Sequence, residues 1–252
     1  MTQSKTNLER PWLKHVVPGN PKEIEIPIIS LPQLLDESVA TYSNHTAITF
    51  YGKTFSYQEL SDNIKKAAKG LSKSGVGKGD RVAIMLPNCP QYPVSFYSIL
   101  ACGGIVVQVN PMYQASELIH ILNDSGAKAI IVMDQLLPLI EAIRAQTPIQ
   151  EVYPVSVESA YLPDELLIED EGELQTVEIN PVEDVAVLQY TGGTTGTPKG
   201  AMLTHFNIVA NTLQSEATST VKVKKGEERV LTISPLFHVY GMTSAMSVTF
   251  YL

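Results

Sequence analysis

The residue types best suited to chemistry in this chain lie between Thr191 and Lys199. This stretch contains four threonines, three glycines and one lysine. Glycines let the backbone turn sharply and approach a ligand closely, and successive N–H groups in such a turn form a concave anion site. Threonine hydroxyls add hydrogen-bond donors and Lys199 adds a positive charge. The segment therefore predicts a binding site for a polyphosphate, that of ATP.

Two other kinds of phosphate loop do not fit the sequence. A Walker A loop needs Gly-Lys followed by Ser or Thr, so that the lysine opens a helix. Here Pro198 precedes Lys199 and Gly200 follows it, and the proline is incompatible with that helix start. The glycine-rich run 75–79 follows a predicted helix and precedes a predicted strand, the reverse of a dinucleotide fingerprint. We interpret that run as a helix cap and turn.

The elements that must position the loop follow an alternating pattern. We predict strands at 80–86, 105–109, 129–133, 152–157 and 185–188, and helices at 91–101, 116–123 and 136–145. After the loop we predict a short strand at 201–203, a helix at 206–217 and a strand at 229–233. Such alternation is typical of an α/β fold, in which parallel strands are joined by helices that cover both faces of the sheet.

Two capping boxes mark helix starts ahead of this alternation. Ser30 with Gln33, and Ser56 with Glu59, have the spacing in which each side chain bonds the other residue's backbone. The second helix is predicted to run to Gly75. Between the two boxes, residues 47–55 carry two apolar, β-branched runs around a Gly-Lys pair, which predicts a β-hairpin.

Composition excludes several classes of protein. The formal net charge of −8 argues against general nucleic-acid binding, and 44% hydrophobic residues suit a globular enzyme with a substantial core. Cys89 and Cys102 have no Cys-x-x-Cys spacing, so we predict two reduced, buried thiols. No signal-peptide core is present in residues 1–15, and the apolar stretch 94–109 is too interrupted for a membrane span. We predict a cytoplasmic protein.

An acidic segment at 159–180 interrupts the pattern, and we interpret it as a solvated connector and not as a binding surface. We therefore divide the chain into an N-terminal α/β region with an early β-hairpin, 1–182, and the start of a second α/β subdomain that carries the phosphate loop, 183–252.

Several motifs carry a family resemblance. Residues 190–200, Tyr-Thr-Gly-Gly-Thr-Thr-Gly-Thr-Pro-Lys-Gly, resemble the signature of the acyl-adenylate-forming superfamily, and residues 234–241, Ser-Pro-Leu-Phe-His-Val-Tyr-Gly, resemble its next motif. Shorter landmarks are residues 55–60, 80–83, 87–88 and 110–111. The chain looks most like a bacterial long-chain fatty acid–CoA ligase, supported by residues 10–13. The implied fold is an incomplete large N-terminal domain, with layered αβα subdomains and parallel-rich sheets.

The resemblance implies activation of a fatty acid, with ATP, Mg²⁺ and coenzyme A. It assigns the ATP phosphates to Thr191, Gly192, Gly193, Thr194, Thr195, Gly196 and Lys199. His238 and Lys199 are the implied catalytic residues, and His238, Tyr240 and Gly241 the implied acyl-pocket residues. Which threonine touches the magnesium ion stays open. No nucleic-acid partner is implied, while peripheral contact with a membrane stays open.

Other family elements are absent from the sequence: the adenine-contacting motif, the ribose-binding aspartate, the hinge and the C-terminal domain with its catalytic lysine. We therefore expect a piece of a longer enzyme that is inactive alone and able to self-associate. Two alternatives stay open: a ligase that adenylates an aryl or amino acid, and a non-catalytic nucleotide-binding module.

Overall fold

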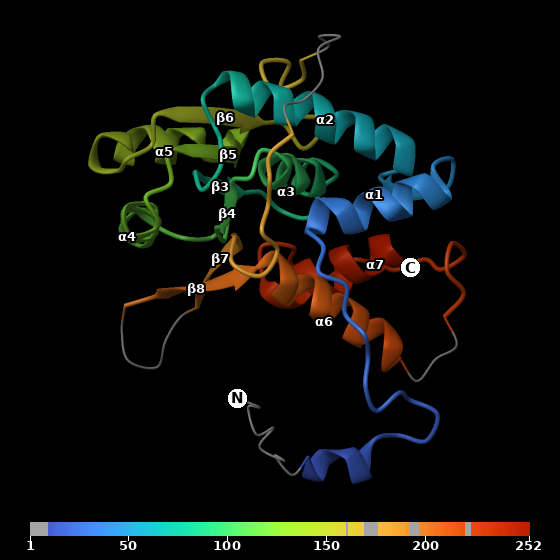
Figure 1. Ribbon diagram of the computed structural model, residues 1–252. Coiled ribbons are helices and arrows are strands. Elements are labelled where there is room, and N and C mark those ends of the chain that lie inside the picture. Colours follow the sequence, from blue (N-terminus) through green and yellow to red (C-terminus); the bar gives the residue numbers. More distant parts are fainter. Residues whose placement is uncertain (1–9, 160, 169–175, 192–196, 220–222) are drawn as a thin grey trace.

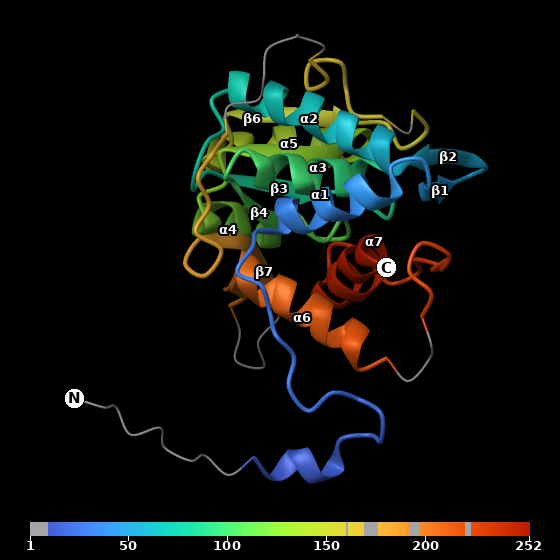
Figure 2. The same cartoon turned by 45° about the vertical axis from the view of Figure 1, so that its right-hand side comes forward.

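The structure is a computed structural model that describes residues 10–159, 161–168, 176–191, 197–219 and 223–252. A six-stranded sheet runs through the body of the molecule, and helices lie on both of its faces (Figure 1). The short helix η1 (Pro11–His15) lies away from that body in both views (Figures 1 and 2), whereas Ile26 and Ile29, just before α1 (Leu31–Tyr42), pack against the main core. In the part of the chain described, no helix is long and apolar enough to cross a bilayer.

The sheet has the strand order β6-β5-β3-β4-β7-β8. Its strands are β3 (Arg81–Met85), β4 (Ile105–Gln108), β5 (Ala129–Met133), β6 (Glu151–Val155), β7 (Val185–Thr191) and β8 (Lys199–Thr204). All neighbouring pairs are parallel except β7 with β8, which is antiparallel. The parallel-rich α/β sheet predicted from the sequence is confirmed.

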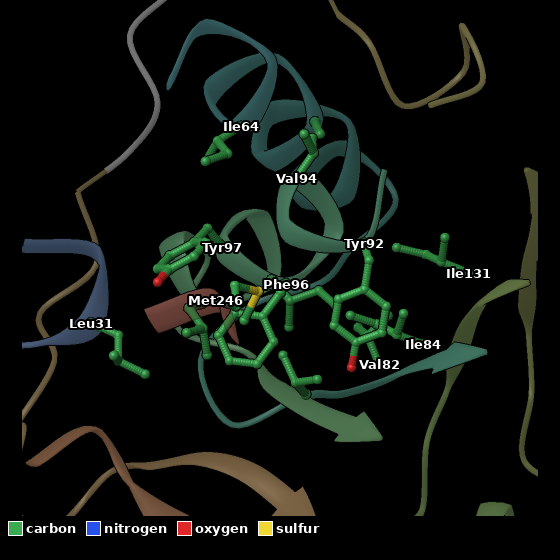
Figure 3. Packing of buried hydrophobic residues seen from close by; sticks show 14 of the residues in the cluster. Leu31, Ile64, Val82, Ile84, Tyr92, Val94, Phe96, Tyr97, Ile131 and Met246 are labelled. Atoms are coloured by element: carbon green, nitrogen blue, oxygen red, sulfur yellow. The ribbon is translucent and has the colours of Figure 1, made fainter. Parts of the chain in front are cut away.

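The central strands are mostly apolar because helices cover both faces of the sheet. One face packs against α1 (Leu31–Tyr42), α2 (Tyr57–Lys73), α3 (Gln91–Ala101) and α6 (His205–Ala217). The other packs against α4 (Ala115–Ser125) and α5 (Leu137–Ile143), with the short turns η2 (Asp134–Leu136) and η3 (Arg144–Gln146) beside α5. Figure 3 shows the first core, where Tyr92 and Phe96 of α3 lie over Val82 and Ile84 of β3.

The predicted capping boxes are both present. Ser30 and Gln33 exchange side-chain and backbone hydrogen bonds at the start of α1, and Ser56 and Glu59 do so at the start of α2. At the other end of α2, Gly75 has a φ of +83°, and its N–H donates to the carbonyl of Ser72. The run 75–79 is therefore a helix cap and turn, as predicted.

The predicted hairpin is formed by β1 (Thr46–Phe50) and β2 (Lys53–Ser56). Its turn lies one residue earlier than the sequence suggested. Tyr51 and Gly52 have φ values of 45° and 80°, and Lys53 already pairs with Phe50. Two successive positive φ angles give the turn a twist that matches the strands.

The acidic connector is only partly solvated, which corrects the prediction. Asp164 and Glu165 are exposed as expected, but Leu162 and Leu166 are buried in the main core. The two leucines are four residues apart, so one turn of chain brings both to the core, and their burial outweighs the neighbouring charges. The acidic residues of 169–175 lie outside the described residues.

The predicted strand at 229–233 is wrong. The segment pairs with no strand among the described residues, and Leu231 and Ile233 are 82% and 77% exposed. A β-branched pattern gives a strand only where a neighbouring strand supplies hydrogen bonds. Beyond it, the chain forms a π-helical segment, η4 (Gly241–Ser247), that continues into α7 (Val248–Tyr251).

The proposed division near residue 183 stays a prediction. β7 and β8 follow that point in the chain, yet they extend the same sheet as β3–β6.

Candidate functional site

The candidate site lies at the carboxyl ends of the parallel strands. β3 is flanked by β4 on one side and by β5 on the other, so the chain reverses its direction across the sheet after β4, and the helices that follow β3 and β4 lie on opposite faces. Ligands of open α/β sheets bind in the crevice outside such a switch point. Asn88 follows β3, Asn110 follows β4, and the predicted phosphate loop follows β7, all at this edge.

Asn88 holds the segment that leads to His238. Its Nδ2 donates to the carbonyl oxygens of Thr232 and Ser234 at 3.2 and 3.0 Å. Its Oδ1 accepts from the Leu236 N–H at 2.9 Å. The half-buried side-chain amide of Asn88 thus makes the hydrogen bonds that a neighbouring strand would have made had this segment formed a strand.

Gln108, the last residue of β4, ties the same segment to the sheet. Its Nε2 donates to the Leu236 carbonyl at 3.1 Å and to the Tyr92 hydroxyl at 3.0 Å. Burial of Tyr92 raises the pKa of its phenol well above the ordinary value, so the hydroxyl stays neutral. Gln108 pairs in register with Gln189 of β7, two residues before the phosphate loop begins. The His238 segment and the loop are therefore anchored on neighbouring strands.

The three predicted acyl-pocket residues lie where that segment turns into a helix. His238 is exposed, and its Nδ1 accepts from the Tyr240 N–H at 3.3 Å. Tyr240 is 64% exposed, whereas Gly241 is buried. A Cβ on Gly241 would stand 2.0 Å from the Pro235 carbonyl oxygen, so only glycine fits this turn. The motif at 234–241 is thus a compact turn that presents His238 at the surface.

The ends of the predicted phosphate loop are paired, and both are exposed. Thr191, the last residue of β7, is the Cα partner of Lys199, the first residue of β8. Lys199 begins a strand and not a helix, so the exclusion of a Walker A loop is confirmed. The remaining predicted phosphate ligands lie outside the described residues: Gly192, Gly193, Thr194, Thr195 and Gly196.

Helix α4 contacts both ends of this loop. The Tyr190 hydroxyl donates to Asp124 Oδ2 at 2.6 Å, and the His120 ring Nε2 lies 3.0 Å from the Pro198 carbonyl oxygen. Desolvation, followed by the Asp124 carboxylate, raises the pKa of Tyr190 well above its ordinary value. Its phenol therefore remains a hydrogen-bond donor at neutral pH.

A cavity of about 340 Å³ with a mixed lining opens beside the segment, between the β1–β2 hairpin and the helix formed by η4 and α7. Cys89, Leu236 and Phe250 are among its lining residues. Burial raises the pKa of the Cys89 thiol to about 11. The thiol is therefore neutral at physiological pH, and it lines the cavity without acting as a nucleophile. None of the three predicted acyl-pocket residues lines the cavity, and their role stays a prediction.

The described residues do not form a magnesium site by themselves. Magnesium in ATP sites takes one or two carboxylates together with water and phosphate oxygens. In the described ranges no three His, Cys, Asp or Glu side chains gather to hold an ion. The Thr191 hydroxyl is the one predicted threonine ligand whose position is described.

Sequence reasoning missed the supporting residues of the site. The sequence marks Asn88 only as part of a family landmark, and no local pattern distinguishes Gln108, His120 or Asp124. The Asn after a strand end was the one signal available, because polar residues there face the crevice. A histidine and an aspartate on an exposed helix look like any solvated face until the tertiary contact is known.

Comparisons with known proteins identify the family of the chain. The AMP-binding enzyme family matches residues 35–252. A long-chain-fatty-acid–CoA ligase of Bacillus subtilis is 40% identical, over 95% of this chain and 48% of its own length. One from Escherichia coli is 36% identical, over 94% and 47%. The chain thus spans about half the length of these curated relatives.

Solved structures show the same fold. A long-chain-fatty-acid–CoA ligase from Archaeoglobus fulgidus superimposes with a TM-score of 0.82 at 31% identity, over 94% of this chain and 48% of its own. An anthranilate CoA ligase, at 22% identity and a TM-score of 0.79, shares the fold. The family match across residues 35–252, the parallel-rich sheet and the motifs at its carboxyl edge lead to one conclusion: this chain belongs to the AMP-binding enzyme family.

Proposed function

We propose that the protein carrying this chain activates a fatty acid with ATP and transfers the acyl group to coenzyme A. The carboxylate oxygen attacks the α-phosphorus, the bond to the bridging oxygen breaks, and pyrophosphate leaves. The thiolate of coenzyme A then attacks the acyl carbon, the bond from that carbon to the AMP oxygen breaks, and AMP leaves. The single observation that carries the proposal is the anchoring of the loop ends and of the His238 segment on β7 and β4, at one edge of the sheet.

The chemical difficulty of the first step is electrostatic, because an anion must approach a polyanion. Preorganised N–H groups and positive charge that hold the β- and γ-phosphates offset the charge that develops on departing pyrophosphate. In our proposal Thr191 and Lys199, with the loop 192–196 between them, supply that environment. Exposed His238 orients the carboxylate, and Tyr240 and Gly241 line the start of the acyl path.

In this proposal ATP binds together with Mg²⁺. Its chemistry would be to neutralise phosphate charge. The Thr191 hydroxyl is one candidate ligand from the chain, and the phosphate oxygens of ATP provide the others.

The nature of the acid is proposed from the relatives. The B. subtilis and E. coli proteins bear the name of long-chain-fatty-acid–CoA ligases, which supports a fatty acid. The anthranilate ligase shares the fold, so aryl acids are the next class to test.

The test is acid-dependent exchange of pyrophosphate into ATP, measured on the whole protein with fatty, aryl and amino acids. We expect exchange with long-chain fatty acids and none without acid. Lys199→Ala should slow it roughly 100-fold, the loss typical of one preorganised charge-stabilising group. Lys53→Ala, on the exposed hairpin, is the matched control and should leave exchange unchanged.

Each other result has a definite meaning. Exchange only with an aryl or amino acid would replace the substrate class. ATP binding without exchange for any acid would favour a non-catalytic nucleotide-binding module. Exchange by residues 1–252 alone would contradict our expectation that further segments are needed.

A further inference from the structure

One face of helix α4 contacts both ends of the phosphate loop. His120 and Asp124 are four residues apart in α4, so their side chains lie on the same side of the helix. Asp124 meets Tyr190, the residue just before Thr191, and His120 meets Pro198, the residue just before Lys199. The helix thus spans the loop at its base.

At the entry to the loop, the contact depends on Gly200. Tyr190 and Gly200 are Cα partners across β7 and β8. A Cβ on Gly200 would stand 3.0 Å from the Tyr190 ring, closer than side chains normally approach. The missing side chain therefore leaves room for the ring, whose hydroxyl reaches Asp124 at 2.6 Å.

At the exit from the loop, the contact fixes the carbonyl that precedes Lys199. A carbonyl oxygen only accepts hydrogen bonds, so the His120 Nε2 must carry the proton in this contact. Pro198 has a fixed φ and no N–H, and the bond to His120 restrains the peptide that joins it to Lys199. The backbone of Lys199 therefore starts β8 from a position set by α4.

We propose that α4 is a brace for the phosphate loop and that His120 and Asp124 are positioning residues for the polyphosphate of ATP. The inference rests on the proposed function, since it assigns the loop to ATP. A loop whose ends are held in advance loses less conformational freedom on binding, and its charge-stabilising groups need no reorganisation during reaction. Neither residue is placed in contact with ATP; both act through the loop.

The test compares four variants of the whole protein. His120→Leu removes the donor to Pro198, and Tyr190→Phe removes only the hydroxyl that reaches Asp124. His120→Gln keeps an N–H donor at a similar distance from the helix. Asn123→Ala is the matched control, because Asn123 lies on α4 but bonds the Gln146 carbonyl instead of the loop.

In steady-state pyrophosphate exchange, we expect His120→Leu and Tyr190→Phe each to raise the KM for ATP about three- to tenfold, the effect of one hydrogen bond. The KM for fatty acid should not change. His120→Gln should recover most of the loss, and Asn123→Ala should match the unmodified protein. A purely structural defect would alter both KM values and would not be rescued by glutamine.

Amide hydrogen exchange separates this proposal from the proposed function. The peptide covering residues 190–200 should exchange faster in His120→Leu and Tyr190→Phe, while peptides from β3 to β6 keep their protection. Unchanged exchange in that peptide, together with an unchanged KM for ATP, would overturn the brace. If the unmodified protein shows no acid-dependent reaction, the proposed function fails and the amide exchange alone decides whether α4 braces the loop.

Discussion

At the scale of single residues, the side chain of Asn88 holds the turn that precedes His238. Its amide satisfies three backbone groups of residues 232–236, which would otherwise lack partners in this part of the chain. Buried or half-buried backbone groups without partners are costly, so the turn that precedes His238 depends on this one side chain. Asn88 thereby connects the end of β3 to the position of His238.

We expect Asn88→Asp to weaken the turn selectively. A carboxylate still accepts from the Leu236 N–H, but it cannot donate to the carbonyls of Thr232 and Ser234. The loss of two hydrogen bonds should lower the free energy of unfolding by about 1–3 kcal/mol. It should also slow acid-dependent pyrophosphate exchange, because His238 would be misplaced. Thermal unfolding and the exchange assay check both effects.

Asn63→Ala is the control, since the Asn63 amide bonds the Glu59 carbonyl within α2. An Asn88→Asp variant as stable and active as the control variant would contradict the importance of the Asn88 contacts.

At the scale of elements, features that depend on neighbouring residues could be predicted from the sequence, and features that depend on distant residues could not. Helix starts at Ser30 and Ser56 were predicted correctly because a capping box needs only residues three apart in the sequence. The prediction of a strand at 229–233 was wrong, because a strand needs a neighbouring strand to pair with, and the local sequence pattern does not contain that neighbour. The supports of the loop, such as His120, could not be predicted either, since 78 residues separate it from Pro198.

The connector between β6 and β7 gives an element-scale prediction. Gly70, inside α2, lies against the backbone of Leu166, and a Cβ there would stand 2.4 Å from the Leu166 carbonyl oxygen. Gly→Ala normally stabilises a helix interior. Here we expect Gly70→Ala to destabilise the protein by about 1–3 kcal/mol, because the connector must move and expose Leu162 and Leu166.

A thermal unfolding midpoint measures this change. Gly77→Ala serves as the control, because its Cβ would meet nothing closer than Asp80 Oδ2 at 3.8 Å. If Gly70→Ala raised the midpoint, helix propensity would outweigh the contact and the docking of the connector would be weak.

At the scale of the whole molecule, His205 joins segments that are far apart in the chain. Its Nδ1 accepts from the Leu31 N–H at 3.3 Å, which connects the first turn of α1 to the first turn of α6 across 174 residues. His205 is 1% exposed, and burial lowers its pKa from 6.5 to about 4, although Asp184 acts in the opposite direction. The ring is therefore neutral in the folded protein over most of the acidic range.

This burial predicts a pH-dependent stability. Because the folded pKa lies below the unfolded value, the unfolded chain takes up the proton first as the pH falls. The stability contributed by neutral His205 is complete above pH 6.5 and declines as the pH falls toward about 4, by about 3 kcal/mol in all. His205→Gln, which cannot titrate, should show a flatter profile of unfolding midpoint against pH in this window.

His45→Gln tests whether the effect belongs to the buried ring, because His45 is exposed. Parallel profiles for the unmodified protein and His205→Gln would show that His205 does not set the pH dependence.

The order of strands in the sheet also bears on how the molecule is made. β3, β4, β5 and β6 are consecutive in the chain and contiguous in the sheet, so they can pair while later residues are still being synthesised. The chain leaves β6 at one edge of this four-stranded set and must cross to the other edge before β7 can pair with β4. The phosphate loop is therefore synthesised after these four strands. Until β7 arrives, β4 is an open edge of a nascent chain, the kind of surface that neighbouring polypeptides can pair with and chaperones protect.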